Sequence, residues 1–268
     1  MHLKTSERRF FYWKKPMRNI ITITTDLGDS FAAAQIRSVV AALEYDGDLI
    51  ENHDVSSFSI TEGAFQILTL TRFCPKEAIY VGIVDPGVGS DRAGIAIRSN
   101  NYWFVGPNNG LLYPAANSDG ILKIWRLKEL QVSDYVSNTF HGRDVFIKVA
   151  VYLANGKKPE DFQSEQLSTA DLVTNSFQNG QVLHVDHYGN VKIQWNNKVS
   201  IGKKLILKLK DNNLETPIVK TFSDVDDGKP LALLGSSDTL ELAINLGNIA
   251  TKYSIQTGEI LDIIEVDK

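Results

Sequence analysis

The sequence predicts two domains: an α/β domain with a mostly parallel sheet and flanking helices, followed by an all-β, barrel-like domain. In residues 20–85, short β-branched runs alternate with stretches of helical periodicity at 31–43 and 60–73, a pattern typical of a parallel sheet covered by helices. From residue 181 onward, short alternating segments are separated by turns, which indicates a small barrel or sandwich.

The composition excludes some classes of function. The 268 residues are 43% hydrophobic, enough for a substantial core. A net charge of -4 gives no general electrostatic signature of a nucleic-acid partner. The single cysteine, Cys74, cannot form an intrachain disulfide, and no apolar run approaches the ~20 residues that span a bilayer. We therefore expect a cytoplasmic protein with no membrane or nucleic-acid partner.

The domain boundaries follow from changes in composition and hydrophobic periodicity along the sequence. Residues 1–18 mix cations with aromatics without a clear period, and we expect a disordered extension. The α/β domain is predicted at 19–160, a polar linker at 161–180 and the β domain at 181–268. In the β domain, strands are expected at 181–187, 190–195, 203–210, 216–221, 231–234, 239–244, 250–255 and 259–266.

Two buried strands of the first domain end in an aspartate. The β-branched run 19–25 stops at Asp26, and the apolar run 78–84 stops at Asp85. Ligands of open α/β sheets bind beyond the carboxyl ends of the strands, so two acids on one rim indicate a binding site. Either acid taken singly could instead be a helix cap.

The loop after Asp85 carries an arginine. Pro86 cannot donate to a sheet ladder, and Gly87 and Gly89 let the backbone pass close to a ligand, so the strand must end here. Arg92 follows Asp85 by seven residues, far enough along the loop to fold back toward it. From these residues alone, the pair is either part of a ligand site or a surface salt bridge.

Past this loop, short strands are expected at 94–98 and 102–105. The turn at 106–112, rich in Pro, Asn and Gly, is either purely geometric or also offers amides to a ligand.

His141 lies just ahead of the helical stretch 145–154, where the positive end of the helix dipole favours a neutral imidazole that can accept a proton. A structural cap is the alternative reading of this histidine.

Two turns of the β domain contain polar residues of interest. Residues 186–190 join two strands, and Ser236 and Ser237 lie in a turn that enters another strand. Such residues form hairpin turns without any ligand, so neither turn is informative alone. His184 and His187 look like a metal pair, but side chains three apart on a strand point to opposite faces, and we predict no metal.

Together these motifs resemble those of the S-adenosyl-L-methionine hydroxide adenosyltransferases, a family related to the fluorinating and chlorinating enzymes. The resemblance covers about residues 20–265 and rests on seven motifs in the family's order and spacing. The motifs are Thr25, Asp26 and Gly28; His53, Asp54 and Val55; residues 84–90 with Arg92; Pro107 with residues 109–112; residues 139–144; Asp186 with residues 188–190; and Ser236 with Leu240 and Glu241.

The resemblance implies an α/β domain followed by a β-barrel, with S-adenosyl-L-methionine bound between the subunits of a homotrimer. The implied reaction is attack of water or hydroxide at the ribose C5′, which yields adenosine and L-methionine without a cofactor. In the family an Asp–Arg–His set serves the nucleophile, and it matches Asp85, Arg92 and His141. Because a guanidinium stays protonated, we expect Arg92 to stabilise hydroxide and either Asp85 or His141 to take the proton.

The same matching assigns the substrate contacts. Asp26 would hold the ribose hydroxyls, Asp186 the methionine ammonium, Asn190 the adenine edge, and Ser236 the methionine carboxylate. Ser237 is expected to be a further substrate-binding residue. These assignments suit the chemistry, since a carboxylate has two oxygens for a vicinal diol and an amide offers the paired donor and acceptor that a purine edge requires.

Two residues depart from the family pattern. Asn108 stands where an aspartate is common, and Asp238 where a glycine is common, so Asp238 could repel the substrate carboxylate.

Two other functions are compatible with the resemblance: a halogenating enzyme on the same substrate, and a non-catalytic trimer that binds adenosyl compounds. Asp85 argues against the first because it would repel halide, and Arg92 and His141 beside C5′ argue against the second.

Overall fold

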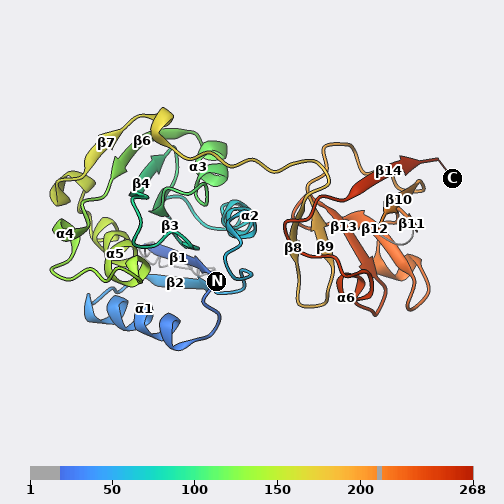
Figure 1. The fold of residues 1–268 in the computed structure, drawn as a ribbon, viewed down its shortest axis with the longest axis horizontal. Coiled ribbons are helices and arrows are strands. Elements are labelled where there is room, and N and C mark those ends of the chain that lie inside the picture. The colour runs from blue at the N-terminus through green and yellow to red at the C-terminus, as the bar shows by residue number, and fades with distance from the viewer. Residues whose placement is uncertain (1–18, 210–212, 268) are drawn as a thin grey trace, which may run out of the picture.

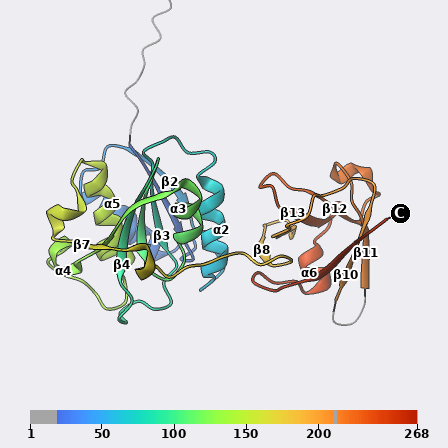
Figure 2. The same ribbon diagram turned by 90° about the horizontal axis from the view of Figure 1, so that it is seen from above.

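The computed structural model describes residues 19–209 and 213–267. Figures 1 and 2 show two domains side by side, joined by an extended segment between β7 (Glu165–Leu167) and β8 (Val182–Val185). The extension predicted at residues 1–18 lies outside the described residues. Within the described part of the chain, no helix combines the length and the apolar character needed to cross a bilayer.

A seven-stranded sheet forms the centre of the N-terminal domain. Its other strands are β1 (Ile20–Thr25), β2 (Asp48–Asn52), β3 (Ile79–Ile83), β4 (Gly94–Ser99), β5 (Trp103–Pro107) and β6 (Ile121–Arg126). The strand order is β2-β1-β3-β5-β4-β6-β7, and β2, β1, β3 and β5 pair in parallel. The mostly parallel sheet is confirmed, and β4, β6 and β7 extend it through antiparallel pairs.

Helices cover both faces of this sheet. The elements are α1 (Phe31–Ala42), α2 (Ile60–Leu70), α3 (Tyr113–Asp119), the short α4 (Glu129–Val132), a π-helical turn η1 (Gly142–Phe146) and α5 (Ile147–Ala154). One core packs α1, η1 and α5 against β1, β3 and β5, and the other packs α2 and α3 against the opposite face. Helix α1 is capped by Ser30, whose hydroxyl accepts from the backbone N–H of Ala33.

The C-terminal domain contains two small antiparallel sheets. Its further strands are β9 (Val191–Ile193), β10 (Lys204–Lys208), β11 (Asn213–Pro217), β12 (Pro230–Leu234), β13 (Leu240–Ile244) and β14 (Asp262–Val266), in the orders β11-β10-β14 and β12-β13-β9-β8. A single apolar cluster lies between them and includes Leu205, Ile193 and Leu242. The antiparallel β domain is confirmed, whereas its closure into a barrel stays a prediction.

Three local expectations differ from the structure. The strand expected at 250–255 is wrong: α6 (Ile249–Tyr253) is a helix, whose first turn is capped by the Asn248 side chain accepting from Thr251 N–H. The strand expected at 216–221 is displaced, because β11 ends at Pro217 and the short η4 (Phe222–Asp224) follows. The polar stretch 161–180 contains β7, which pairs with β6 at the edge of the large sheet.

Candidate functional site

The end of β3 places Asp85 beyond the edge of the sheet. Val84 is fully buried and anchors the chain, and the Val88 N–H donates to the Asp85 carbonyl in a turn. Gly89 has a φ of +78°, and a Cβ on it would lie 2.3 Å from the backbone oxygen of Asn138. The loop therefore turns where glycine alone fits, and it carries the chain back toward Asp85.

Arg92 folds back onto Asp85 as the seven-residue spacing predicts. Its Nε donates to Asp85 Oδ1 at 2.9 Å, and its Nη2 donates to Asp85 Oδ2. Both side chains are less than a tenth exposed, and the guanidinium lies 5.3 Å from the ring centre of Phe146. A buried, bidentate pair of this kind is not the exposed salt bridge that was the alternative reading of these residues.

His141 joins this pair. Its Nδ1 lies 2.8 Å from Arg92 Nη2, and its side chain is 7% exposed. His141 directly precedes η1, as predicted, and Gly142 lets this turn approach the sheet, because a Cβ on Gly142 would lie 2.5 Å from Ile83 Cγ2. The structure therefore brings Asp85, Arg92 and His141 into one cluster.

A fourth charged residue, Glu129, contacts the cluster. Its Oε1 lies 3.2 Å from His141 Nδ1 and 3.8 Å from Arg92 Nη1. Arg92 Nη1 is buried and has no hydrogen-bond partner among the described residues. No motif in the sequence marks Glu129: it lies near the cluster because Ile95 of β4 pairs with Arg126 of β6, and Arg92 and Glu129 flank these paired strand ends.

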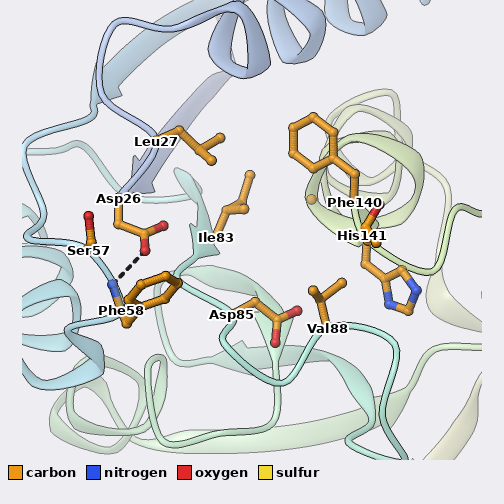
Figure 3. Close-up of a pocket in the computed structure, with 11 residues that line it drawn as sticks. Asp26, Leu27, Ser57, Phe58, Ile83, Asp85, Val88, Phe140 and His141 are labelled. Carbon is orange, nitrogen blue, oxygen red and sulfur yellow. Dashed lines mark hydrogen bonds between the residues drawn. The ribbon is translucent and has the colours of Figure 1, made fainter.

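The predicted strand-end acids line one cavity of about 340 Å³. Asp26 and Phe58 lie on one side and His141 on the other, with Asp85 between them beside Val88 (Figure 3). Asp26 Oδ2 accepts from the Phe58 N–H at 2.8 Å, which orients the carboxylate. We call this the front cavity; it presents Asp26 and two members of the cluster to one ligand-sized space.

A second cavity, of about 800 Å³, lies in the C-terminal domain. Asp186, Asn190 and Ser236 line it, as do Tyr188 and Lys192, whereas Ser237 does not. Asp186 Oδ1 accepts from the backbone N–H groups of Tyr188 and Asn190, and its Oδ2 accepts from the Asn190 amide at 3.1 Å. The turn at 186–190 is thus a rigid hairpin turn, and it also presents polar side chains to a cavity.

The two cavities share no lining residue. Within one chain the structure does not bring Asp26, Asp85 and His141 together with Asp186, Asn190 and Ser236. Each domain carries half of the predicted residues.

Both departures from the family pattern have local partners. The Asn108 side chain donates to the Asp171 carbonyl and accepts from the Val173 N–H, both at 2.9 Å, a role that needs an amide rather than a carboxylate. Asp238 pairs with Arg72 at 2.8 Å and adopts a φ of +57°, a conformation that glycine adopts without strain. The Asp238 charge is thereby partly neutralised by a residue at the end of α2.

Lys192 and Leu246 line the C-terminal cavity, and no motif in the sequence marks them. Lys192 donates to Glu241 at 2.7 Å and lies 3.9 Å from Asp186 Oδ2, so it links two carboxylates along the wall of the cavity. The sequence signal for Lys192 is its spacing: it lies in β9, two residues after Asn190, and side chains two apart on an extended chain point to the same side. Tyr188 and Leu246 also line this cavity and are 75% and 86% exposed.

Comparisons with known proteins agree with this architecture. The model of the SAM hydroxide adenosyltransferase N-terminal domain matches residues 21–163, and that of the C-terminal domain matches residues 180–262. A protein named (R)-S-adenosyl-L-methionine hydrolase from Salinispora arenicola is 32% identical over 91% of this chain and 97% of its own. One of the same name from Methanocaldococcus jannaschii is 28% identical over 95% and 98%.

More distant relatives carry another name. A fluorinase from an Actinoplanes species is 24% identical over 89% of this chain and 95% of its own. The crystal structure of an uncharacterized conserved protein from Thermotoga maritima superimposes with a TM-score of 0.81 at 26% identity, covering 91% of this chain and 99% of the other. Since both domain models match in order and together span most of the sequence, this chain belongs to the SAM hydroxide adenosyltransferase family.

Proposed function

We propose that this protein hydrolyses S-adenosyl-L-methionine to adenosine and L-methionine by attack of water or hydroxide at the ribose C5′. The observation that carries the proposal is the buried cluster of Asp85, Arg92 and His141 at the edge of a cavity that also holds Asp26. The relatives named (R)-S-adenosyl-L-methionine hydrolase, which match over nearly their whole length, support the same reaction.

The chemistry demands little bond activation. A sulfonium leaves as a neutral thioether, so the protein must place a water in line behind C5′ and increase its hydroxide character. Arg92 stays protonated and already holds both oxygens of Asp85, which fixes its position. Its Nη2 also lies 2.8 Å from His141 Nδ1, so the guanidinium contacts both groups that could take the proton.

The remaining contacts would be divided between the domains. In the front cavity, Asp26 would hold the ribose hydroxyls. In the C-terminal cavity, Asp186 would bind the ammonium, Asn190 the adenine edge, and Ser236 with Ser237 the carboxylate. Ser237 is the weakest assignment because it does not line the cavity.

The division of the residues supports a site shared between subunits. In a cyclic homotrimer with head-to-tail contacts, the front cavity of each subunit can face the C-terminal cavity of the next subunit. Each interface then contains one complete site. We accordingly propose a cytoplasmic homotrimer with three sites at its interfaces and a closed C-terminal barrel. No cofactor or metal is part of this proposal.

A halogenase is the main alternative, since the chain also has fluorinase relatives. The position of Asp85 argues against it. Asp85 lines the reaction cavity and places a carboxylate where a halide would have to bind, and its pairing with Arg92 offsets only part of the repulsion between the two anions.

The test is a reaction in ¹⁸O-labelled water, after which the products are separated by chromatography and their masses are determined by mass spectrometry. Hydrolysis at C5′ predicts adenosine that carries one ¹⁸O, and free methionine without label. Added fluoride or chloride distinguishes the alternative, which predicts a 5′-halo nucleoside. Unlabelled adenosine, methylthioadenosine alone, or binding of the substrate without turnover would each contradict the proposal.

A further inference from the structure

Glu129 faces the cluster from an element that none of the family motifs includes. Its carboxylate, 29% exposed, reaches His141 Nδ1 from the start of α4, while Arg92 Nη2 reaches the same nitrogen from the opposite loop. One imidazole nitrogen therefore has a hydrogen-bond donor at 2.8 Å and a carboxylate oxygen at ion-pair distance, 3.2 Å.

These two contacts exclude each other for a neutral imidazole. If Nδ1 is unprotonated, it accepts a hydrogen bond from Arg92. The ring hydrogen is then on Nε2, which cannot accept a proton. If Nδ1 carries the hydrogen, it donates to Glu129, and Nε2 is free to act as a base. The partner that holds Nδ1 thus decides whether Nε2 of His141 is an acceptor or a donor.

Arg92 stays anchored to Asp85 if the His141 contact is broken. It keeps two hydrogen bonds to Asp85, and its Nη1 is 3.8 Å from the Glu129 carboxylate. Glu129 places a further carboxylate beside the imidazole, facing the positive charge that forms when His141 takes a proton. Asp26 faces the cluster across the front cavity.

We propose that Glu129 is a positioning residue that holds the Nδ1–H tautomer of His141 and so makes Nε2 the proton acceptor for the attacking water. The inference rests on the proposed hydrolysis and names the base that the sequence leaves open. In this step the water proton moves to Nε2, the water oxygen bonds to C5′, and the electron pair of the C5′–S bond stays on the methionine sulfur.

The released proton also has a path to solvent. Arg92 and Glu129 line a further cavity of about 630 Å³ with Arg126 and Lys128, whereas Asp85 and His141 line the front cavity. The cluster therefore lies between two cavities. When substrate fills the front cavity, the Nδ1 proton of the imidazolium can leave through the partly exposed Glu129 carboxylate.

The kinetic test compares Glu129→Ala, Glu129→Gln and the charge-matched control Asp134→Asn, an exposed acid five residues along the chain. We expect kcat to fall roughly 100-fold in Glu129→Ala with KM within about threefold, because base catalysis is lost while binding is kept. Glu129→Gln should recover part of kcat, because its amide oxygen can still accept from Nδ1–H. Asp134→Asn should retain wild-type kcat. A wild-type kcat in Glu129→Ala would overturn the proposal.

A spectroscopic test does not depend on activity. The five histidines are labelled with ¹⁵N, His141 is assigned with the variant His141→Gln, and spectra are recorded near pH 9, about two units above the usual imidazole pKa. We expect wild-type His141 to carry hydrogen on Nδ1, and Glu129→Ala to carry it on Nε2. Hydrogen on Nε2 in the wild-type protein would overturn the inference. If the tautomer is as expected but no adenosine forms, the proposed function fails instead.

Discussion

Glu62 of α2 and His184 of β8 form a 2.6 Å hydrogen bond between the two domains. Glu62 is only 1% exposed, and its other oxygen accepts from the Ser56 N–H at 2.7 Å. Gln66, one turn along α2, lies 3.4 Å from the same histidine nitrogen. This contact gives His184 a carboxylate partner and connects the α/β domain to the first strand of the β domain.

We predict that His184→Leu lowers the free energy of unfolding by about 3 kcal/mol, because the buried Glu62 carboxylate would lose a partner. The exposed neighbour His187 provides the matched control, and His187→Leu should have an effect below about 0.5 kcal/mol. Urea unfolding of both variants measures the difference. Equal midpoints for the two variants would mean that the contact does not stabilise the domain arrangement.

Arg92→Lys should reduce kcat by about 100-fold or more with little change in KM, because lysine keeps the charge but loses the planar fork that holds Asp85. Arg98→Lys is the control, since Arg98 makes a similar bidentate pair with Glu77 away from the cluster. Steady-state kinetics with S-adenosyl-L-methionine separates the two parameters. Full activity in Arg92→Lys would remove the guanidinium from the mechanism.

The shared site predicts complementation between two inactive variants, Asp85→Ala and Asn190→Ala. In a head-to-tail trimer each mixed ring contains one interface without a lesion. Random exchange at equal concentrations should therefore restore about one quarter of the sites. Activity is measured after mixing, and native mass spectrometry verifies the exchange. Proven exchange without recovered activity would place the whole site within one chain.

Asp238→Gly tests whether the departure at this position impairs substrate binding. The substitution removes an exposed ion pair with Arg72, worth at most about 1 kcal/mol, and relieves a positive φ. We expect nearly unchanged stability, and a KM within about twofold of wild type if Arg72 already screens the charge. Arg72→Ala, which leaves Asp238 unpaired, should raise KM. A large fall in KM in Asp238→Gly would show that Asp238 opposes the substrate carboxylate.

We predict that the free energy of unfolding falls at acid pH because of the buried Asp144 carboxylate. Burial opposes ionisation of its carboxyl group, but hydrogen bonds from Arg143 and from the Ser137 N–H outweigh it and lower its pKa. A carboxyl whose pKa is lower in the folded state stabilises the fold above its unfolded pKa, about 3.9, and loses this contribution as the pH falls through the folded value. Asp144→Asn should cost about 2 kcal/mol at pH 7 and less near pH 2. A pH-independent difference in urea midpoint would contradict this account.

The residues that end strands were the most predictable part of the site. Asp26 and Asp85 follow buried β-branched or apolar runs, and Arg92 lies within reach along one loop, so local sequence determines their placement. Glu129 could not be predicted, because its contact with His141 depends on how β4 pairs with β6, a relation between segments about 30 residues apart.

The errors in the fold have local causes. Residues 250–255 read as a strand because the alternation of polar and apolar residues outweighed the Asn248 cap, which begins a helix only five residues long. The strand β7 has the sequence Glu-Gln-Leu and shows no apolar alternation, so its pairing with β6 leaves no local signal.

The close approach of Gly142 to Ile83 means that the separation of two reacting side chains depends on core packing. Asp85 follows β3 and His141 precedes η1, and these elements touch where residue 142 has no side chain. One added methyl group would move the imidazole away from the carboxylate without altering either residue. Substitutions at Ile83 should therefore change turnover even where the protein remains fully folded, because core packing sets the distance between the Asp85 carboxylate and the His141 imidazole.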